Sequence, residues 1–253
     1  MKKLLSEIPV LILAGGLGTR LRSVVSDKPK ALAPIGDKPF LQIQMELLRD
    51  QGARKFVLCV GYRSEQVLDQ FGDGTKLGIE IAYSEERESL LGTGGAIRNA
   101  LKFIPERAMV LNGDTYLDFD HNELLNIHLD ALNSGAKATC TLARLEDSSR
   151  FGTVILDDQS KYLAGFREKN SESKGPAWLN AGAYLLEKSF IEEIEAGKVV
   201  SLERDTFPTA IRNGNKIACT LSEKPFYDIG TPEDFLGFCE LYKRWKNDRH
   251  RAA

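Results

Sequence analysis

Short apolar runs that alternate with helical patterns set the strongest limit on what this chain can fold into. Four such runs lie in the first 115 residues, at 10–13, 56–60, 79–83 and 108–111. A run this short and this apolar is typical of a parallel strand that is buried on both faces. Apolar residues at helical spacing lie between the runs, at 40–48, 64–71 and 95–103. This alternation predicts an α/β fold with a doubly wound, mostly parallel sheet.

After Asp114 the alternation of strand and helix gives way to β-rich stretches separated by polar turns. These stretches lie at 138–143, 152–156, 162–166 and 180–186. They predict a mixed or antiparallel extension of the same sheet rather than an independent domain. We therefore expect a single domain in three parts, which are residues 8–115, residues 116–232 and a C-terminal helix and tail at 233–253.

Three positions mark expected helix ends. Gly52 follows the pattern at 40–48 as a C-cap candidate, and Ser64 opens the pattern at 64–71 as a cap. Thr231 precedes Pro232, with an acid at the third position after it, which is typical of a helix start. The helix that follows carries large apolar residues at helical spacing: Phe235, Phe238, Leu241, Tyr242 and Trp245. We interpret them as core or as a subunit contact, which leaves a homo-oligomer open.

Charge and composition narrow the expected partners. The 253 residues carry a net charge of −2, and a local excess of basic over acidic residues shows in only one short stretch. Nucleic-acid binding normally needs a broader basic excess, so no nucleic-acid partner is expected. No run of about eighteen apolar residues occurs, which argues against a membrane span. The four cysteines are scattered without a C-x-x-C pair, as in a reducing compartment, so we expect a cytoplasmic protein.

A glycine-rich loop follows the first predicted strand and gives the first indication of chemistry. It reads Leu13-Ala14-Gly15-Gly16-Leu17-Gly18-Thr19-Arg20-Leu21. Glycines allow main-chain N–H groups to approach phosphate oxygens closely, and the spacing matches neither the dinucleotide fingerprint nor the P-loop. Several cations follow in this otherwise slightly acidic chain, namely Arg20, Arg22, Lys28 and Lys30. They favour a polyphosphate ligand. A merely solvated basic loop is the alternative.

These residues resemble the signature of the sugar nucleotidyltransferases, which are nucleoside diphosphate–sugar pyrophosphorylases. Further motifs follow in the order found in that family: Lys28-Pro29-Lys30, Leu91-Gly92-Thr93-Gly94-Gly95-Ala96, Asn112-Gly113-Asp114, Phe151-Gly152-Thr153-Val154, Glu168-Lys169, Asn180-Ala181-Gly182 and Asp228-Ile229-Gly230-Thr231-Pro232. The resemblance covers most of the chain. It implies a Rossmann-like nucleotidyltransferase fold, in which residues 8–115 bind the nucleotide and residues 116–232 bind the sugar phosphate.

The family reaction is attack of a sugar-1-phosphate oxygen on the α-phosphorus of a nucleoside triphosphate, which yields a nucleotide sugar and pyrophosphate. The resemblance assigns Arg20 to the triphosphate and the departing pyrophosphate, and Lys30 to phosphate oxygens near the reacting phosphorus. It assigns Asp114 a catalytic role and, together with Asp228, the binding of Mg²⁺. Each aspartate ends an apolar run beside a glycine, so we expect the two carboxylates to meet at the carboxyl edge of the sheet. Asp114 taken alone also fits an Asx-turn or a cap.

The resemblance also implies the substrate contacts. The nucleotide contacts are Leu13, Ala14, Gly15, Gly16, Gly18, Thr19, Arg20, Lys30, Glu85, Gly92 and Thr93. The sugar-phosphate contacts are Gly152, Glu168, Lys169 and Asn180. The Glu-Lys motif usually ends in proline in this family, whereas Asn170 follows here. This departure weakens the expected turn but keeps both chemical groups.

Two observations bear on the base and the sugar. Glutamates at 85 and 86 stand where pyrimidine-specific relatives commonly carry an amide side chain. A carboxylate only accepts hydrogen bonds, which suits the two donors on one edge of guanine, although both glutamates facing solvent is the alternative. The stretches at 18–30, 91–97 and 112–118, above all 22–27, resemble the D-glycero-D-manno-heptose 1-phosphate guanylyltransferases. That likeness implies GTP and heptose 1-phosphate as substrates, and GDP-heptose made for bacterial cell-surface glycans.

Three other functions stay open. Within the enzyme class they are mannose-1-phosphate guanylyl transfer, and thymidylyl or uridylyl transfer to a hexose 1-phosphate. Outside it, the chain would be an inactive regulatory subunit that binds a nucleotide sugar. Such relatives usually lose a metal carboxylate or a reactive basic residue, and here all of these are present: Arg20, Lys30, Asp114, Lys169 and Asp228.

Overall fold

A central sheet of seven strands organises the computed structural model, which describes residues 5–18, 21, 28–146, 152–167 and 175–251. The strands run in the order β12-β8-β11-β6-β1-β4-β5. Their bounds are β1 Val10–Leu13, β4 Lys55–Val60, β5 Glu80–Glu85, β6 Arg107–Asn112, β8 Ala138–Leu145, β11 Ala177–Glu187 and β12 Ile217–Ser222. All pairings are parallel except those of β11 with β6 and with β8. The predicted doubly wound, mostly parallel sheet is confirmed.

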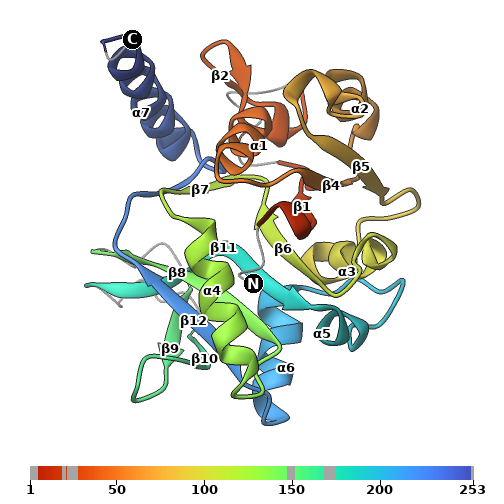
Figure 1. The fold of residues 1–253 in the computed structure, drawn as a ribbon, viewed down its shortest axis with the longest axis vertical. Helices are drawn as coiled ribbons and strands as arrows, with labels where there is room; N and C mark the ends of the chain where they lie inside the picture. Colours follow the sequence, from red (N-terminus) through yellow and green to blue (C-terminus); the bar gives the residue numbers. More distant parts are fainter. Residues whose placement is uncertain (1–4, 19–20, 22–27, 147–151, 168–174, 252–253) are drawn as a thin grey trace.

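Helices cover both faces of this sheet (Figure 1). One face carries α1 Phe40–Asp50, α2 Ser64–Phe71 and α4 His121–Leu132, and the other carries α3 Gly92–Asn99, α5 Lys188–Glu192 and α6 Phe207–Arg212. Two small ribbons lie outside the sheet, β2 Pro34–Ile35 with β3 Lys38–Pro39 and β7 Thr115–Leu117 with β13 Phe226–Asp228. Short 3₁₀ turns occupy Leu5–Glu7, Lys30–Leu32, Thr75–Leu77 and Leu101–Phe103, and one turn of π-helix (called the π-turn below) spans Leu202–Thr206.

Two hydrophobic cores, one on each side of the sheet, explain why the N-terminal strands are apolar at successive positions. In β1, Val10 and Ile12 pack into the core beneath α1, α2 and α4, whereas Leu11 packs into the core beneath α3, α5 and α6. All three side chains are fully buried. Successive side chains of a strand point to opposite faces, so a strand covered on both sides is apolar throughout.

The second half of the chain follows the prediction only in part. β8 and β11 extend the main sheet, and β12 adds an edge strand that the sequence pattern did not reveal. The other two β-rich stretches, β9 Thr153–Leu156 and β10 Leu163–Arg167, instead form an antiparallel hairpin of their own. Most of their side chains are half-buried or exposed, so these strands do not suit the interior of a sheet that is covered on both faces.

Two of the three expected helix ends are confirmed. Thr231 caps α7 Pro232–Arg251, because its Oγ1 accepts a hydrogen bond from the Asp234 main-chain N–H at 3.2 Å. Gly52 lies just beyond α1 with a φ of 111°, a conformation that favours glycine. The predicted cap of α2 is wrong. Ser64 is the first helical residue, and the N-cap residue is Arg63, which has a φ of 54° and forms no side-chain cap bond.

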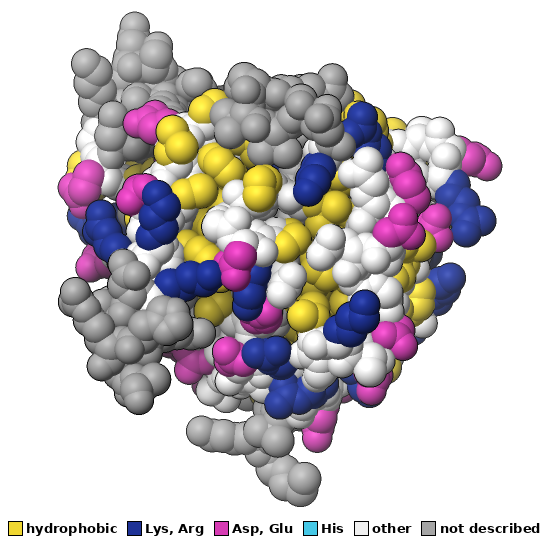
Figure 2. All heavy atoms as spheres, turned by 90° about the horizontal axis from the view of Figure 1, so that it is seen from above, with side chains coloured by type: hydrophobic (Ala, Val, Ile, Leu, Met, Phe, Trp, Pro, Cys, Tyr) yellow, Lys and Arg dark blue, Asp and Glu magenta, His cyan; other side chains and the backbone are white. Residues whose placement is uncertain are grey.

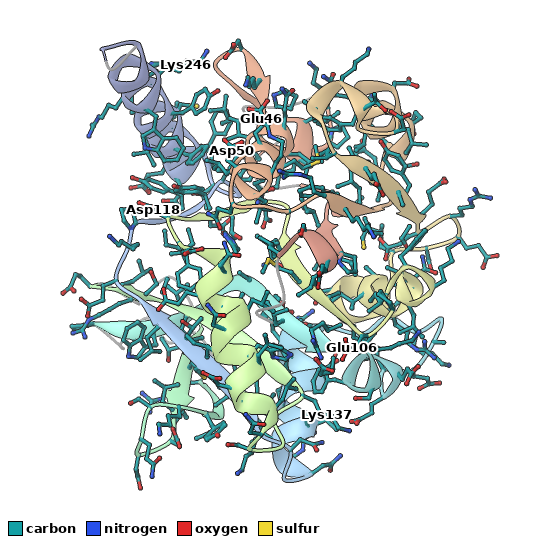
Figure 3. All side chains as sticks on the ribbon, viewed as in Figure 1. Glu46, Asp50, Glu106, Asp118, Lys137 and Lys246 are labelled. Carbon is teal, nitrogen blue, oxygen red and sulfur yellow. The ribbon has the colours of Figure 1, made fainter. Side chains whose placement is uncertain are left out.

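An aromatic cluster ties α7, at the upper left of Figure 1, to the rest of the fold. Phe235 and Phe238 are buried in this cluster together with Phe40 from the start of α1. The rings of Phe238 and Phe40 meet edge to face with their centroids 5.1 Å apart. Farther along α7, Lys246, labelled in Figure 3, forms an ion pair with Asp37 in the turn between β2 and β3. These two phenylalanines are therefore core residues, as one of the two sequence interpretations expected.

The surface charges and the cysteines do not point to a particular function. On the face shown in Figure 2, the coloured Lys and Arg side chains are interspersed with Asp and Glu rather than gathered into one basic area. Within the described ranges, no helix combines the length and the apolar character that crossing a membrane requires. All four cysteines are free thiols, and three of them are buried.

Candidate active site

The loop after β1 is closely packed at two of its glycines. A Cβ atom on Gly15 would lie 2.6 Å from Glu86 Oε2. A Cβ atom on Gly18, whose φ is +58°, would lie 2.8 Å from the Lys30 Cβ. The loop therefore brings main-chain atoms to the wall of a cavity of about 170 Å³. This cavity is lined by Leu13, Ala14, Gly16, Gly18, Lys30, Ala31, Gly113, Asp114 and Gly230.

Lys30 joins two carboxylates in this first cavity. Its Nζ lies 2.6 Å from Asp114 Oδ2 and 3.6 Å from Asp228 Oδ1. Lys30 begins a 3₁₀ turn whose next two residues, Ala31 and Leu32, are buried and anchor it. The side chains of Lys30 and Asp228 are 12% and 15% exposed, so water screens their interaction only in part. The predicted meeting of the two aspartates is confirmed, with Lys30 between them.

A two-stranded ribbon explains how residues so far apart in the chain meet. β7 and β13 pair antiparallel, and Thr115 lies opposite Asp228. The Ile229 N–H donates to the Asp114 carbonyl at 2.9 Å, and the Gly230 N–H donates to Asp228 Oδ1 at 2.8 Å. A Cβ atom on Gly230 would lie 2.5 Å from Lys30 Nζ, so only glycine leaves the lysine its present position.

Gln44 supports Asp114 from behind and was not found by sequence reasoning. This α1 residue is 5% exposed, and its Nε2 donates to the Asn112 carbonyl at 3.0 Å and to the Thr115 carbonyl at 2.8 Å. These two carbonyls lie on either side of the Gly113-Asp114 turn. The sequence did contain a signal for Gln44, which is an amide on the apolar face of a predicted helix. A buried polar group needs a specific hydrogen-bond partner, so such a residue is a candidate for a supporting role.

A second cavity of about 240 Å³ adjoins the first, and Leu13, Gly16 and Asp114 line both. Its other lining residues are Gly15, Glu86, Leu90, Gly92, Thr93, Ala96 and Asn112. The structure therefore brings the loop after β1 together with Gly92 and Thr93 at the start of α3. Thr93 directs its hydroxyl to Glu203 Oε2, at 2.8 Å.

Of the two glutamates at 85 and 86, Glu86 rather than Glu85 lines the second cavity. Glu85 ends β5 and lies 3.3 Å from the Arg87 guanidinium. Glu86 Oε1 accepts a hydrogen bond from the Leu91 N–H at 2.8 Å. Burial raises the pKa of Glu86, while that hydrogen bond lowers it, and the net shift is upward. Adjacent residues of a strand point to opposite faces. Predicting which of the two glutamates faces the cavity therefore requires knowing where β5 ends, and the sequence did not show this.

A third cavity, of about 550 Å³, lies between the β9–β10 hairpin and α6. It brings together Gly152 and Asn180, two of the predicted sugar-phosphate contacts. Most of the Asn180 side chain is already engaged, because Nδ2 donates to Tyr184 OH at 2.7 Å and Oδ1 accepts from the Gly182 N–H at 3.0 Å. Glu203 also lines this cavity and was not identified from the sequence.

Comparison with known families identifies the fold that carries this site. The profile of the family described as Nucleotidyl transferase matches residues 9–244. The chain belongs to this family. Its central sheet and the loop after β1 are therefore the nucleotidyl transferase framework.

Two relatives and one solved structure show where the chain stands within the nucleotidyl transferases. It is 40% identical to a D-glycero-alpha-D-manno-heptose 1-phosphate guanylyltransferase of Campylobacter jejuni, across 90% of this chain and 97% of the relative. It is 36% identical to a mannose-1-phosphate guanylyltransferase of Mycobacterium tuberculosis, across 91% of this chain but 63% of that relative. The crystal structure of HddC from Yersinia pseudotuberculosis superposes with a TM-score of 0.81 at 33% identity, covering 93% of this chain and 99% of HddC. HddC has also been crystallised in complex with GMP-PN.

Four predicted site residues lie outside the described residues of this nucleotidyl transferase. Thr19 and Arg20 follow the glycine loop, and Glu168 and Lys169 follow β10. The stretch at 22–27 that distinguishes the heptose-specific relatives lies outside them too. The assignments at these positions stay predictions.

Proposed function

We propose that this chain transfers the guanylyl group of GTP to a sugar 1-phosphate, with D-glycero-α-D-manno-heptose 1-phosphate as its acceptor. The observation that carries the reaction class is the contact of Lys30 with both Asp114 and Asp228 beside the glycine loop. The base and the sugar are supported by the name of the Campylobacter jejuni relative, which matches along nearly its whole length. The products would be GDP-heptose and pyrophosphate.

The reaction joins two anionic substrates, so cations must offset their repulsion. An oxygen of the sugar phosphate forms a bond to the α-phosphorus of GTP, and the bond from that phosphorus to the oxygen bridging the β-phosphorus breaks. Lys30 would turn from Asp114 to the phosphate oxygens, where negative charge develops, and Arg20 would bind the departing pyrophosphate. The loop at 13–18 would hold the triphosphate with main-chain N–H groups, which fixes the in-line geometry.

Mg²⁺ is the cofactor we propose, held by Asp114 and Asp228. The fit rests on the donor set, because two carboxylates that share one ammonium group form an anionic pocket of hard oxygens. No cluster of three or more acidic, histidine or cysteine side chains suited to a metal occurs among the described residues. Two protein ligands suit Mg²⁺, which keeps several waters and binds substrate phosphates. When bound, the ion would neutralise phosphate charge that Lys30 and Arg20 leave uncompensated.

The two substrates would occupy the cavities described above. The guanine would lie in the second cavity, where Glu86, in place of the predicted Glu85, can accept from both donors on one edge of the base. The sugar would enter the third cavity beside Gly152 and Asn180. The family resemblance assigns Glu168 and Lys169 to the same sugar phosphate. We further propose a cytoplasmic location and a role in supplying cell-surface glycans.

The test is a substrate panel. GTP, ATP, UTP, CTP and dTTP are each combined with heptose, mannose and glucose 1-phosphates, and pyrophosphate release is measured in the presence of Mg²⁺. The proposal predicts the highest kcat/KM for GTP with the heptose phosphate. Preference for mannose 1-phosphate would support the alternative suggested by the Mycobacterium tuberculosis relative. Preference for UTP or dTTP would overturn the guanylyl assignment, and no release with any pair would point to an inactive regulatory subunit.

A further inference from the structure

Hydrogen-bonded side chains connect the wall of the second cavity to the wall of the third. Glu203 lies at the centre of this network and accepts hydrogen bonds from three hydroxyl groups. They come from Thr93 at 2.8 Å, Ser201 at 2.9 Å and Tyr184 at 3.0 Å. Tyr184 OH in turn accepts from Asn180 Nδ2 at 2.7 Å. Thr93 lines the second cavity and Asn180 lines the third, so the network spans the protein between them.

The chemistry of the network gives every bond a fixed direction. A carboxylate has no proton to donate, so the Thr93 and Tyr184 hydroxyls must both point at Glu203. Tyr184 is fully buried, and its hydroxyl therefore has no water to turn to. Hydrogen bonds to an ionised acceptor are the stronger kind. Displacing Glu203 would consequently move or unpair the Thr93 hydroxyl, toward the second cavity, and the Tyr184 hydroxyl, toward the third.

The main chain ties Glu203 to the start of α3 as well. Glu203 lies in the π-turn Leu202–Thr206, a rare geometry that often marks functional positions. Just before this turn, the Val200 carbonyl accepts from the Gly94 N–H at 2.9 Å. A Cβ atom on Gly92 would lie 2.6 Å from the same carbonyl, so the two segments are in close contact. A shift of the first turn of α3 would therefore be passed on to Glu203.

We infer that Glu203 is a positioning residue that couples nucleotide binding to the shape of the sugar-phosphate cavity. The inference rests on the proposed function, in which the second and third cavities hold the two substrates. A nucleotide in the second cavity fixes Thr93, Thr93 fixes Glu203, and Glu203 fixes Tyr184 and Asn180. Because coupling of binding free energies is reciprocal, a bound sugar phosphate tightens nucleotide binding by the same factor.

The test is a pair of substitutions whose effects appear at the distant substrate. Thr93→Val removes the hydroxyl and keeps the branched shape, whereas Thr93→Ser keeps the hydroxyl. Thr93 does not line the third cavity, yet Thr93→Val should raise the KM for the sugar phosphate roughly 10-fold, within the usual range of coupling factors. Thr93→Ser should raise the sugar-phosphate KM far less than Thr93→Val does, because it keeps the hydroxyl that donates to Glu203. Tyr184 does not line the second cavity, yet Tyr184→Phe should raise the KM for GTP.

Controls separate coupling from general damage. Glu195→Gln makes the same chemical change as Glu203→Gln at a side chain that is 73% exposed, and should alter neither KM. Adding Thr93→Val to Glu203→Gln should raise the sugar-phosphate KM no further, because an amide offers one acceptor oxygen where the carboxylate offers two, and so cannot accept from both Thr93 and Tyr184. The inference is overturned if the two effects multiply, or if Thr93→Val changes the KM for GTP alone.

The same variants remain informative if the wild type releases no pyrophosphate, which would refute the proposed function itself. In that case calorimetry with GTP and heptose 1-phosphate measures each affinity in the presence and absence of the other ligand. Coupling in the wild type that is lost in Thr93→Val and kept in Thr93→Ser supports the inference. Equal coupling in all three proteins overturns it.

Discussion

Replacing Gln44 with leucine is the most informative perturbation of the site, because Gln44 touches no substrate cavity yet supports Asp114. Its amide nitrogen donates to the carbonyls of Asn112 and Thr115, on either side of the turn that carries Asp114. Leucine fills a similar volume and offers no donor. The substitution therefore removes both hydrogen bonds and leaves the apolar packing of α1 in place.

The expected change in the free energy of unfolding follows from the two lost hydrogen bonds and one compensating gain. Each neutral hydrogen bond contributes about 1 kcal/mol, so losing both costs about 2 kcal/mol. Gln44 Oε1 has no hydrogen-bond partner among the described residues, and removing this buried oxygen returns up to about 1 kcal/mol. We expect a loss of about 1–2 kcal/mol in the free energy of unfolding. The effect on catalysis should be larger, because a displacement of about 1 Å at a reacting group can cost roughly 100-fold in rate.

The assay combines urea denaturation with kinetics of pyrophosphate release over a range of Mg²⁺ concentrations. Gln44→Leu should lower kcat at least roughly 10-fold and shift the Mg²⁺ dependence to higher concentration. Gln42→Leu is the matched control, since Gln42 is a half-buried residue of the same helix that bonds to Glu46. It should leave both kcat and the Mg²⁺ dependence unchanged. If Gln44→Leu lowered stability by the expected amount with normal kinetics, the positioning argument would be refuted.

Three further predictions concern charged groups. Lys30→Met should lower kcat by roughly 100-fold or more, because it removes the cation at the reacting phosphate; near-normal turnover would contradict this role. Burial opposes ionisation of Glu187, but hydrogen bonds from His128 and Arg107 outweigh it and lower its pKa from 4.5 to about 2. This carboxylate should therefore add roughly 3 kcal/mol of stability above pH 4.5 that is lost as the pH falls toward 2, and Glu187→Gln should flatten acid unfolding curves in that window. Burial raises the pKa of Glu86 above its ordinary value of 4.5, so GTP binding, which needs the ionised form, should begin to weaken at a higher pH than an exposed carboxylate would cause; a KM for GTP that stays constant as the pH falls toward 4.5 would argue against Glu86 as the guanine acceptor.

Sequence reasoning predicted those parts of the fold whose burial can be recognised from the apolar residues of a single segment. The strand at Val10–Leu13 is apolar at successive positions because a core lies on each side of it, and the sequence alone records this. The hairpin of β9 and β10 was assigned to the main sheet because a short strand does not reveal its neighbours. Pairing depends on long-range contacts that no local pattern encodes.

The same distinction applies to the candidate site. The motifs predicted that Asp114 and Asp228 would meet, since both follow apolar runs, but not that Lys30 would lie between them. Glu86, one position beyond the predicted Glu85, lines the second cavity, because β5 ends at Glu85. Glu203 acts through partners up to 110 residues away, so its role appears only once the fold is known.

The central claim is that guanylyl transfer takes place where Lys30, Asp114 and Asp228 meet, and its most direct measurement is turnover of Asp228→Asn against Mg²⁺. The wild type should convert GTP and heptose 1-phosphate to GDP-heptose and pyrophosphate in equal amounts. Asp228→Asn should fold normally, need far more Mg²⁺ and turn over roughly 100-fold more slowly, since one metal carboxylate is gone. An Asp228→Asn enzyme with wild-type turnover and wild-type Mg²⁺ dependence would contradict the account.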